Sequence, residues 1–75
     1  LAGYNVYASK DGWIAVAALE PHFAEALGKA LGVVPLDAER LAARFAQETA
    51  LHWETWARSR DLPIAALRPP SPPES

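Results

Sequence analysis

The first twenty residues show an apolar pattern that predicts a β-hairpin. The stretches YNVYASK and WIAVAAL, within residues 4–19, flank the dipeptide Asp11-Gly12. An Asp-Gly pair between two apolar stretches is a strong signal for a two-residue hairpin turn, which would place Tyr7 opposite Val16. Both faces of this hairpin are largely apolar, which favours a sheet that is covered on both sides. The alternation places Tyr7, Ile14 and Val16 on one face, and Tyr4, Val6, Ala15 and Ala17 on the other.

The middle of the chain predicts three helices. Proline is favoured at the first helical position, so one helix is expected from Pro21 to Leu31. Aspartate and threonine cap helix starts with their side-chain oxygens. We therefore expect a second helix after Asp37 and a third from Thr49 to about Arg60.

The last apolar segment, LPIAAL, predicts an edge strand because it is short and carries Pro63 near its start. Added to the hairpin, this strand would complete a three-stranded sheet. The expected order is β-β-α-α-α-β, which describes a small α+β domain over residues 1–67. Residues 68–75, RPPSPPES, are rich in proline and serine, a composition typical of a flexible tail.

Composition narrows the function classes. A chain of 75 residues allows one small domain or a piece of a larger protein. The net charge of -2 and the scattered basic residues argue against nucleic acid as a partner. No apolar stretch reaches the roughly 18 residues of a membrane span. The absence of cysteine is compatible with the cytoplasm. Because the chain opens on Leu1 with neither Met nor a signal peptide, we expect it to be cut from something longer.

Few residues suggest chemistry by their spacing. No Cys/His cluster predicts a metal site, and neither His22 nor His52 has a nucleophile beside it, so both are expected on the surface. Trp53 and Trp56 lie one helical turn apart, which favours core positions over a platform for a ligand.

Glu20 is the exception, because it stands where the apolar strand meets the helix. Ser, Thr, Asp or Asn would be the usual residue at this place. The positive end of the helix dipole would favour the ionised carboxylate, while Leu19 and Phe23 beside it would limit access of water. Two interpretations stay open. Glu20 is either a serviceable helix cap, or an acidic group that acts as a base or as the partner of another base.

Several short motifs follow one another up to about Leu67: YNVY, Asp11-Gly12, Ala18-Leu19-Glu20-Pro21, Phe23, Leu31-Gly32, ARFAQETALHWETW and DLPIAAL. In this order they resemble the family III CoA-transferases, and most of all the branch of α-methylacyl-CoA racemase. Ala8 stands where that branch often has Arg, and the second strand is one residue shorter than in typical racemases. Racemase and transferase chemistry therefore both stay open.

The resemblance implies a function that this chain would share with a second domain. Such enzymes have a large Rossmann-like domain and a small α+β domain, and two chains interlock as a homodimer with each active site between the two kinds of domain. Glu20 would be an auxiliary catalytic residue that pairs with a His base of the large domain, while Tyr4, Leu19 and Pro21 would lie beside the acyl chain. The substrate would be a coenzyme A thioester, with no other cofactor. The reaction would be C2 proton abstraction from a 2-methylacyl-CoA, or CoA transfer between carboxylic acids. The large domain carries the other catalytic groups, so the chain alone would be inactive.

An alternative of another class is a non-catalytic interaction module. It would dock through an apolar face of its sheet, and its Pro-rich tail would be a ligand for a domain that binds polyproline II helices.

Overall fold

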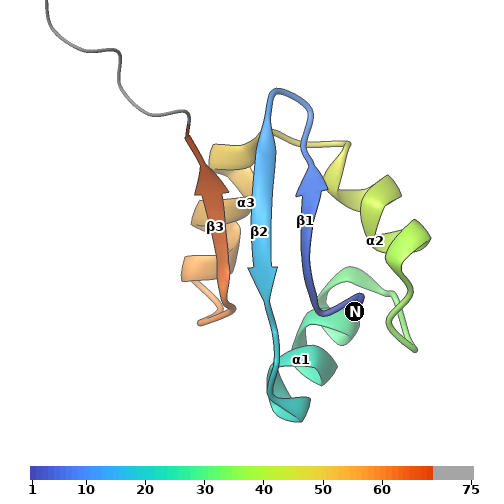
Figure 1. The fold of residues 1–75 in the computed structure, drawn as a ribbon. Helices are drawn as coiled ribbons and strands as arrows, with labels where there is room; N and C mark the ends of the chain where they lie inside the picture. Colours follow the sequence, from blue (N-terminus) through green and yellow to red (C-terminus); the bar gives the residue numbers. More distant parts are fainter. Residues whose placement is uncertain (69–75) are drawn as a thin grey trace, which may run out of the picture.

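The computed structural model describes residues 1–68 and contains three helices beside one sheet (Figure 1). The sheet is antiparallel with the strand order β1-β2-β3. The α+β prediction and the strand order are confirmed, whereas the predicted tail lies outside the described residues except for Arg68. In chain order the elements are β1 (Tyr4–Ala8), β2 (Trp13–Ala17), α1 (Pro21–Leu31), α2 (Ala38–Phe45), α3 (Ala50–Arg58) and β3 (Ile64–Leu67).

Local signals set the helix ends. α1 begins at Pro21 and is followed by Gly32 with φ of 71°, a left-handed conformation that favours glycine. The side chain of Asp37 accepts a hydrogen bond from the backbone N–H of Arg40 at 2.8 Å. The side chain of Thr49 accepts one from the backbone of the third residue along. The caps predicted for α2 and α3 are therefore confirmed.

The hairpin register differs from the prediction. Tyr7 pairs with Ile14 rather than with Val16, and the connection comprises residues 9–12 instead of a two-residue turn. The pairing is shifted by two residues. A side-chain period of two means that such a shift leaves every residue on its expected face.

The longer connection has a structural cause. The backbone N–H of Ser9 donates to the carbonyl of Gly12 at 2.8 Å, and the Gly12 N–H donates back to the Ser9 hydroxyl at 3.0 Å. The Asp11 carboxylate accepts from the Ser9 hydroxyl at 3.2 Å within the turn and from the backbone N–H of Ala50 at 2.9 Å. The connection is thus tied to the start of α3.

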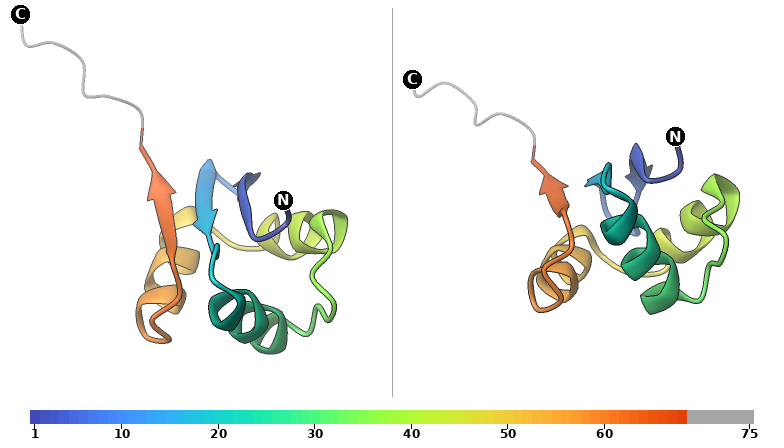
Figure 2. Two further views of the ribbon diagram at one scale, coloured as in Figure 1. Left: turned by 60° about the horizontal axis from the view of Figure 1, so that its bottom comes forward. Right: turned by 90° about the horizontal axis from the view of Figure 1, so that it is seen from below.

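The helices cover one face of the sheet. In the view along the strands, α1, α2 and α3 lie on the same side of it (Figure 2). The strand residues that point toward them are buried, with Ile14 fully so. They pack against Leu41 and Phe45 of α2 and Trp53 of α3, which are also buried. This layer is the hydrophobic core.

The other face of the sheet is open within the described chain, so coverage of both faces is not seen. It is made of apolar side chains, apart from the hydroxyl of Tyr4. Its larger members are Tyr4, Val6, Trp13 and Leu67, which are 56%, 48%, 56% and 47% exposed.

Candidate functional site

Glu20 occupies the N-cap position of α1, but its side chain makes no cap hydrogen bond. Its backbone carbonyl accepts from the N–H groups of Phe23 and Ala24, while its side chain is 67% exposed. The interpretation of Glu20 as a side-chain cap is therefore wrong. The expected shielding from water is also wrong, because both Glu20 and Leu19 are exposed at the surface.

One group lies close to the Glu20 carboxylate. The Nδ1 atom of His22 is 3.4 Å from Glu20 Oε2, and the His22 ring lies against the ring of Phe23 with centroids 4.2 Å apart. His22 is as exposed as Glu20, as predicted for a surface histidine. An exposed pair of this kind contributes little to stability. The carboxylate therefore remains accessible to a group arriving from another domain or chain.

Two of the predicted acyl-binding residues come together. Tyr4 on β1 and Leu19 after β2 line one hollow of about 280 Å³, whose other walls include Ala18, Ala24 and Leu36. Pro21 is exposed at the first position of α1 and does not line this hollow. Antiparallel pairing of β1 with β2 is what brings the two residues to the same end of the sheet.

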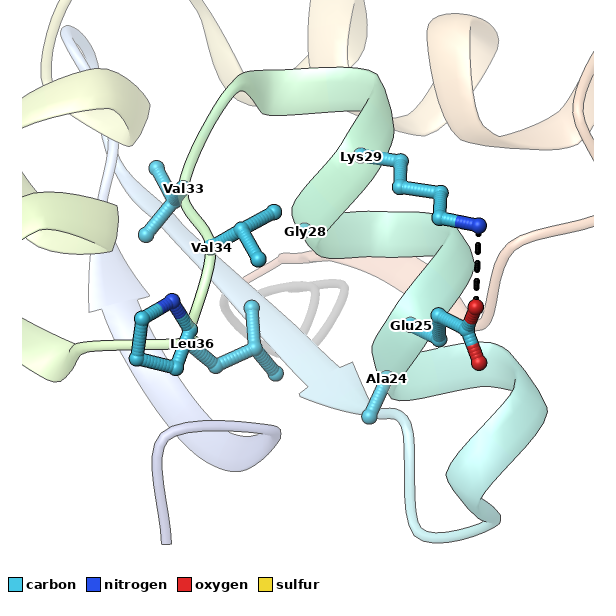
Figure 3. Close-up of a pocket in the computed structure, with 8 residues that line it drawn as sticks. Ala24, Glu25, Gly28, Lys29, Val33, Val34 and Leu36 are labelled. Atoms are coloured by element: carbon cyan, nitrogen blue, oxygen red, sulfur yellow. Dashed lines mark ion pairs between the residues drawn. The ribbon is translucent and has the colours of Figure 1, made fainter.

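A second hollow has a volume of about 470 Å³ (Figure 3). It lies between α1 and the segment that follows it, and Ala24 and Leu36 line both hollows. Sequence reasoning missed it. The available signal was the pair of small residues Ala24 and Gly28, one turn apart on α1, which leaves room beside the helix.

Gly28 also determines how close this segment lies to the helix. A Cβ atom at this position would be 2.7 Å from the carbonyl oxygen of Val33 and 3.3 Å from the side chain of Leu36. Only glycine permits this approach, so the wall of the second hollow is held against α1.

The charged groups near the second hollow neutralise one another. Lys29 Nζ is 2.9 Å from Glu25 Oε1, which is the expected i,i+4 pair. Hydrogen bonding to Lys29 lowers the pKa of Glu25, and the same bond raises the pKa of Lys29. In Figure 3 the charged atoms point away from the side chains of Val33, Val34 and Leu36.

The two helix tryptophans differ in their surroundings. Trp53 is buried and donates its indole N–H to the carbonyl of Phe45 at 2.9 Å, as a core residue would. Trp56 is half-buried, and the Arg60 guanidinium lies 4.7 Å from its ring centroid. A core position is thus confirmed fully for Trp53 and in part for Trp56.

Residues 1–68 contain no group of three or more His, Cys, Asp or Glu side chains that could hold a metal ion. No helix in this part of the chain is long and apolar enough to cross a membrane.

The chain was compared with known proteins. No protein-family model matches it, and no curated protein matches it. The resemblance to the family III CoA-transferases therefore rests on the short motifs of the sequence and stays a prediction.

Proposed function

We propose that this chain is the small α+β domain of an acyl-CoA enzyme of the family III CoA-transferase type, and that it forms one wall of the active site. The observation that carries the proposal is the gathering of Tyr4 and Leu19 around one apolar hollow, followed directly by the exposed carboxylate of Glu20. That carboxylate caps no helix, so its position is explained better by a contact outside this chain.

In this function Glu20 would act through another residue. Its carboxylate would accept a hydrogen bond from the imidazole of a His on the large domain, which orients that ring and stabilises its protonated form. The imidazole would remove the C2 proton of a 2-methylacyl-CoA, and a second acid would return a proton to the opposite face. In a transferase member, an Asp of the large domain would instead take the acyl group while CoA moves between carboxylic acids.

The chain alone is expected to be inactive. Racemisation needs one base on each face of C2, whereas Glu20 and His22 lie 3.4 Å apart and would approach a substrate from the same side. The missing groups would come from the large domain in an interlocked homodimer. Coenzyme A would enter as the thioester substrate, with no other cofactor. A cytoplasmic location fits the absence of cysteine.

The test compares the chain alone with the chain joined to the large domain of a family III enzyme. Each is incubated with 2-methylacyl-CoA in deuterated water, and deuterium at C2 is measured by mass spectrometry. We expect exchange only in the joined protein. Exchange by the isolated chain contradicts the proposal, and so does a folded joined protein that shows neither C2 exchange nor transfer of CoA to a carboxylic acid.

A second function is favoured by the open apolar face of the sheet, which suits an interaction module. One outward N–H group at each sheet edge is already bonded: that of Val6 donates to Asn5 Oδ1 at 2.8 Å, and that of Ala66 donates to Glu54 Oε2 at 2.9 Å. Edges closed in this way disfavour pairing with another strand. A partner would therefore pack on the open face, with the Pro-rich tail as a second ligand.

Mapping the contact distinguishes the two functions. NMR spectra of the labelled chain are recorded with a polyproline-binding domain or with the large domain. If the chain is an interaction module, the polyproline-binding domain should shift its NMR signals. If the chain is part of the enzyme, the large domain should shift the signals of Glu20 and Tyr4.

A further inference from the structure

We propose that the open face of the sheet binds a second copy of this chain, so that two sheets pack face to face about a twofold axis. This face is formed by the outward side chains of β1, β2 and β3, on the side away from the helices (Figure 2). The contact differs from the interlocked homodimer of the proposed function, in which small domains meet large domains. The inference therefore does not rest on acyl-CoA chemistry, and it gives the alternative interaction module a definite partner.

The open face exposes large apolar side chains in one continuous patch. Trp13 and Leu67 are paired on adjacent strands, and Tyr4 and Val6 lie on the other neighbour of the central strand. Each of the four exposes about half of its surface. Contiguous apolar patches of several hundred Å² on a protein surface usually mark an interaction site, so this face indicates a partner.

The area of the patch fits a weak dimer. A large aromatic side chain buries about 150–250 Å² when fully covered, and Tyr4 and Trp13 each have about half of that free. With Val6, Leu67 and the alanines between them, each copy contributes roughly 400–500 Å². An interface of about 900 Å² in total lies at the lower end of specific contacts, where association is weak. In dilute solution the chain is therefore a monomer with this face open, and the dimer forms at high concentration.

The large and small side chains of the central strand are complementary to one another across a twofold axis. Ala15 lies at the middle of β2, with Trp13 two residues to one side and Ala17 two residues to the other. A twofold axis that crosses β2 at Ala15 reverses the strand direction in the second copy. Trp13 then lies over the partner's Ala17, where only a methyl group occupies the surface.

The edge strand β1 follows the same pattern. Val6 pairs with Ala15, so it lies on the same axis and meets the partner's Val6. Tyr4 lies at one end of the strand and Ala8 at the other, so the axis places Tyr4 over the partner's Ala8. Large side chains thus meet small ones on both strands, as in packed sheets whose inner side chains interdigitate. A surface that is complementary to itself is what a twofold dimer requires.

The chemistry of the face favours this contact over others. The outward side chains of the three described strands include no charged group, so no ion loses its water when two copies meet. At each sheet edge one outward N–H group, that of Val6 or of Ala66, is already bonded within the chain, which disfavours pairing through the edges. Two copies therefore meet face to face rather than edge to edge.

The test measures the oligomeric state of residues 1–75 by sedimentation velocity from about 10 µM to about 1 mM, a range suited to weak interfaces of this size. We expect a reversible rise from the monomer mass toward twice that mass. NMR spectra over the same range should show shifts at Trp13 and Val6 and none at Leu51, an exposed leucine of α3. A chain that stays monomeric overturns the proposal, and so do shifts centred on the helices.

Charge variants at the axis test the twofold arrangement. Val6→Lys places two like charges against each other and is expected to weaken the dimer at least about tenfold, and Val6→Glu should do the same. An equal mixture of the two variants should associate again, because opposite charges then meet. Val34→Lys makes the matched change at an exposed valine outside the sheet and should dimerise normally.

Dimerisation that survives Val6→Lys, or that is lost in Val34→Lys, contradicts the proposal. So does a mixture of folded Val6→Lys and Val6→Glu chains that remains monomeric. The concentration-dependent NMR shifts of the original chain decide the question without any variant, should one fail to fold. Deuterium exchange at C2 tests the acyl-CoA function separately, since Glu20 lies outside the open face.

Discussion

The carboxylate of Glu54 on α3 accepts a hydrogen bond from the backbone N–H of Ala66 on β3, at 2.9 Å. The Glu54 side chain is only 15% exposed, and its other oxygen lies 3.3 Å from the guanidinium of Arg68. One side chain thus satisfies an outward N–H group of the edge strand and fastens that strand to the helix behind it.

Replacing Glu54 with alanine should loosen β3. The Ala66 N–H would lose its acceptor, so its hydrogen exchange should accelerate more than that of Ile14 in the central strand. Glu54→Gln keeps an acceptor oxygen, so the exchange rate at Ala66 in this variant should lie between those of the original chain and of Glu54→Ala. Equal exchange at Ala66 in all three proteins would show that the strand is held by its pairing with β2 alone.

Two carboxylates make stability depend on pH. The hydrogen bond from the Ala66 backbone lowers the pKa of Glu54 from its usual value of 4.5, and the bond from the Ala50 backbone lowers the pKa of Asp11 from 3.8. When the pKa of a carboxyl is lower in the folded state, its contribution to stability is complete above the pKa of the unfolded state. That contribution is lost as the pH falls through the pKa of the folded state.

Urea unfolding measured between about pH 5 and pH 2 should therefore show that the free energy of unfolding decreases as the pH is lowered. The double variant Glu54→Gln, Asp11→Asn keeps the acceptor oxygens without their titration. Its stability should fall less steeply over the same range, and an unchanged slope would point to other carboxylates.

Replacing valine with alanine should affect stability differently on the two faces of the sheet. Val16 on the covered face is 2% exposed, and Val6 on the open face is 48% exposed. Val16→Ala should lower the free energy of unfolding by about 2 kcal/mol, from lost burial and the cavity that remains. Val6→Ala should change it by less than about 0.5 kcal/mol. Similar losses in urea unfolding of the isolated chain would mean that the open face is covered, for example by self-association.

The three helix starts offer a comparison of cap residues. Asp37→Ala and Thr49→Ala each remove a side-chain cap and should cost about 1 kcal/mol. Glu20→Ala removes no cap hydrogen bond and should lie within about 0.5 kcal/mol of the original chain. Thermal unfolding of the three variants tests this, and a cost for Glu20→Ala equal to the others would return Glu20 to a structural role.

The sequence predicted those features that depend on neighbouring residues. Pro21, Asp37 and Thr49 act within one helical turn, so the helix starts were confirmed. The predicted length of the hairpin connection was wrong, and the observed connection bonds through the Asp11 carboxylate to the backbone N–H of Ala50, 39 residues away. Periodicity carries no information about such a contact.

In the candidate site, too, the sequence could not predict features that depend on how the chain folds. The exposure of Glu20 and its lack of a cap bond could not be predicted from the sequence, because Leu19 beside it could have turned inward. The second hollow was missed because Leu36 comes to lie beside Gly28 only after the chain has folded back along α1.

The most direct test of the central claim is C2 deuterium exchange in the joined protein with Glu20 replaced by Gln. Glu39→Gln, the same change at an exposed carboxylate on α2 that lines neither hollow, is the control. The account predicts an exchange rate about 100-fold lower for Glu20→Gln, a loss typical of impaired acid–base catalysis, with unchanged folding and a normal rate for the control. Undiminished exchange in folded Glu20→Gln protein would contradict the account.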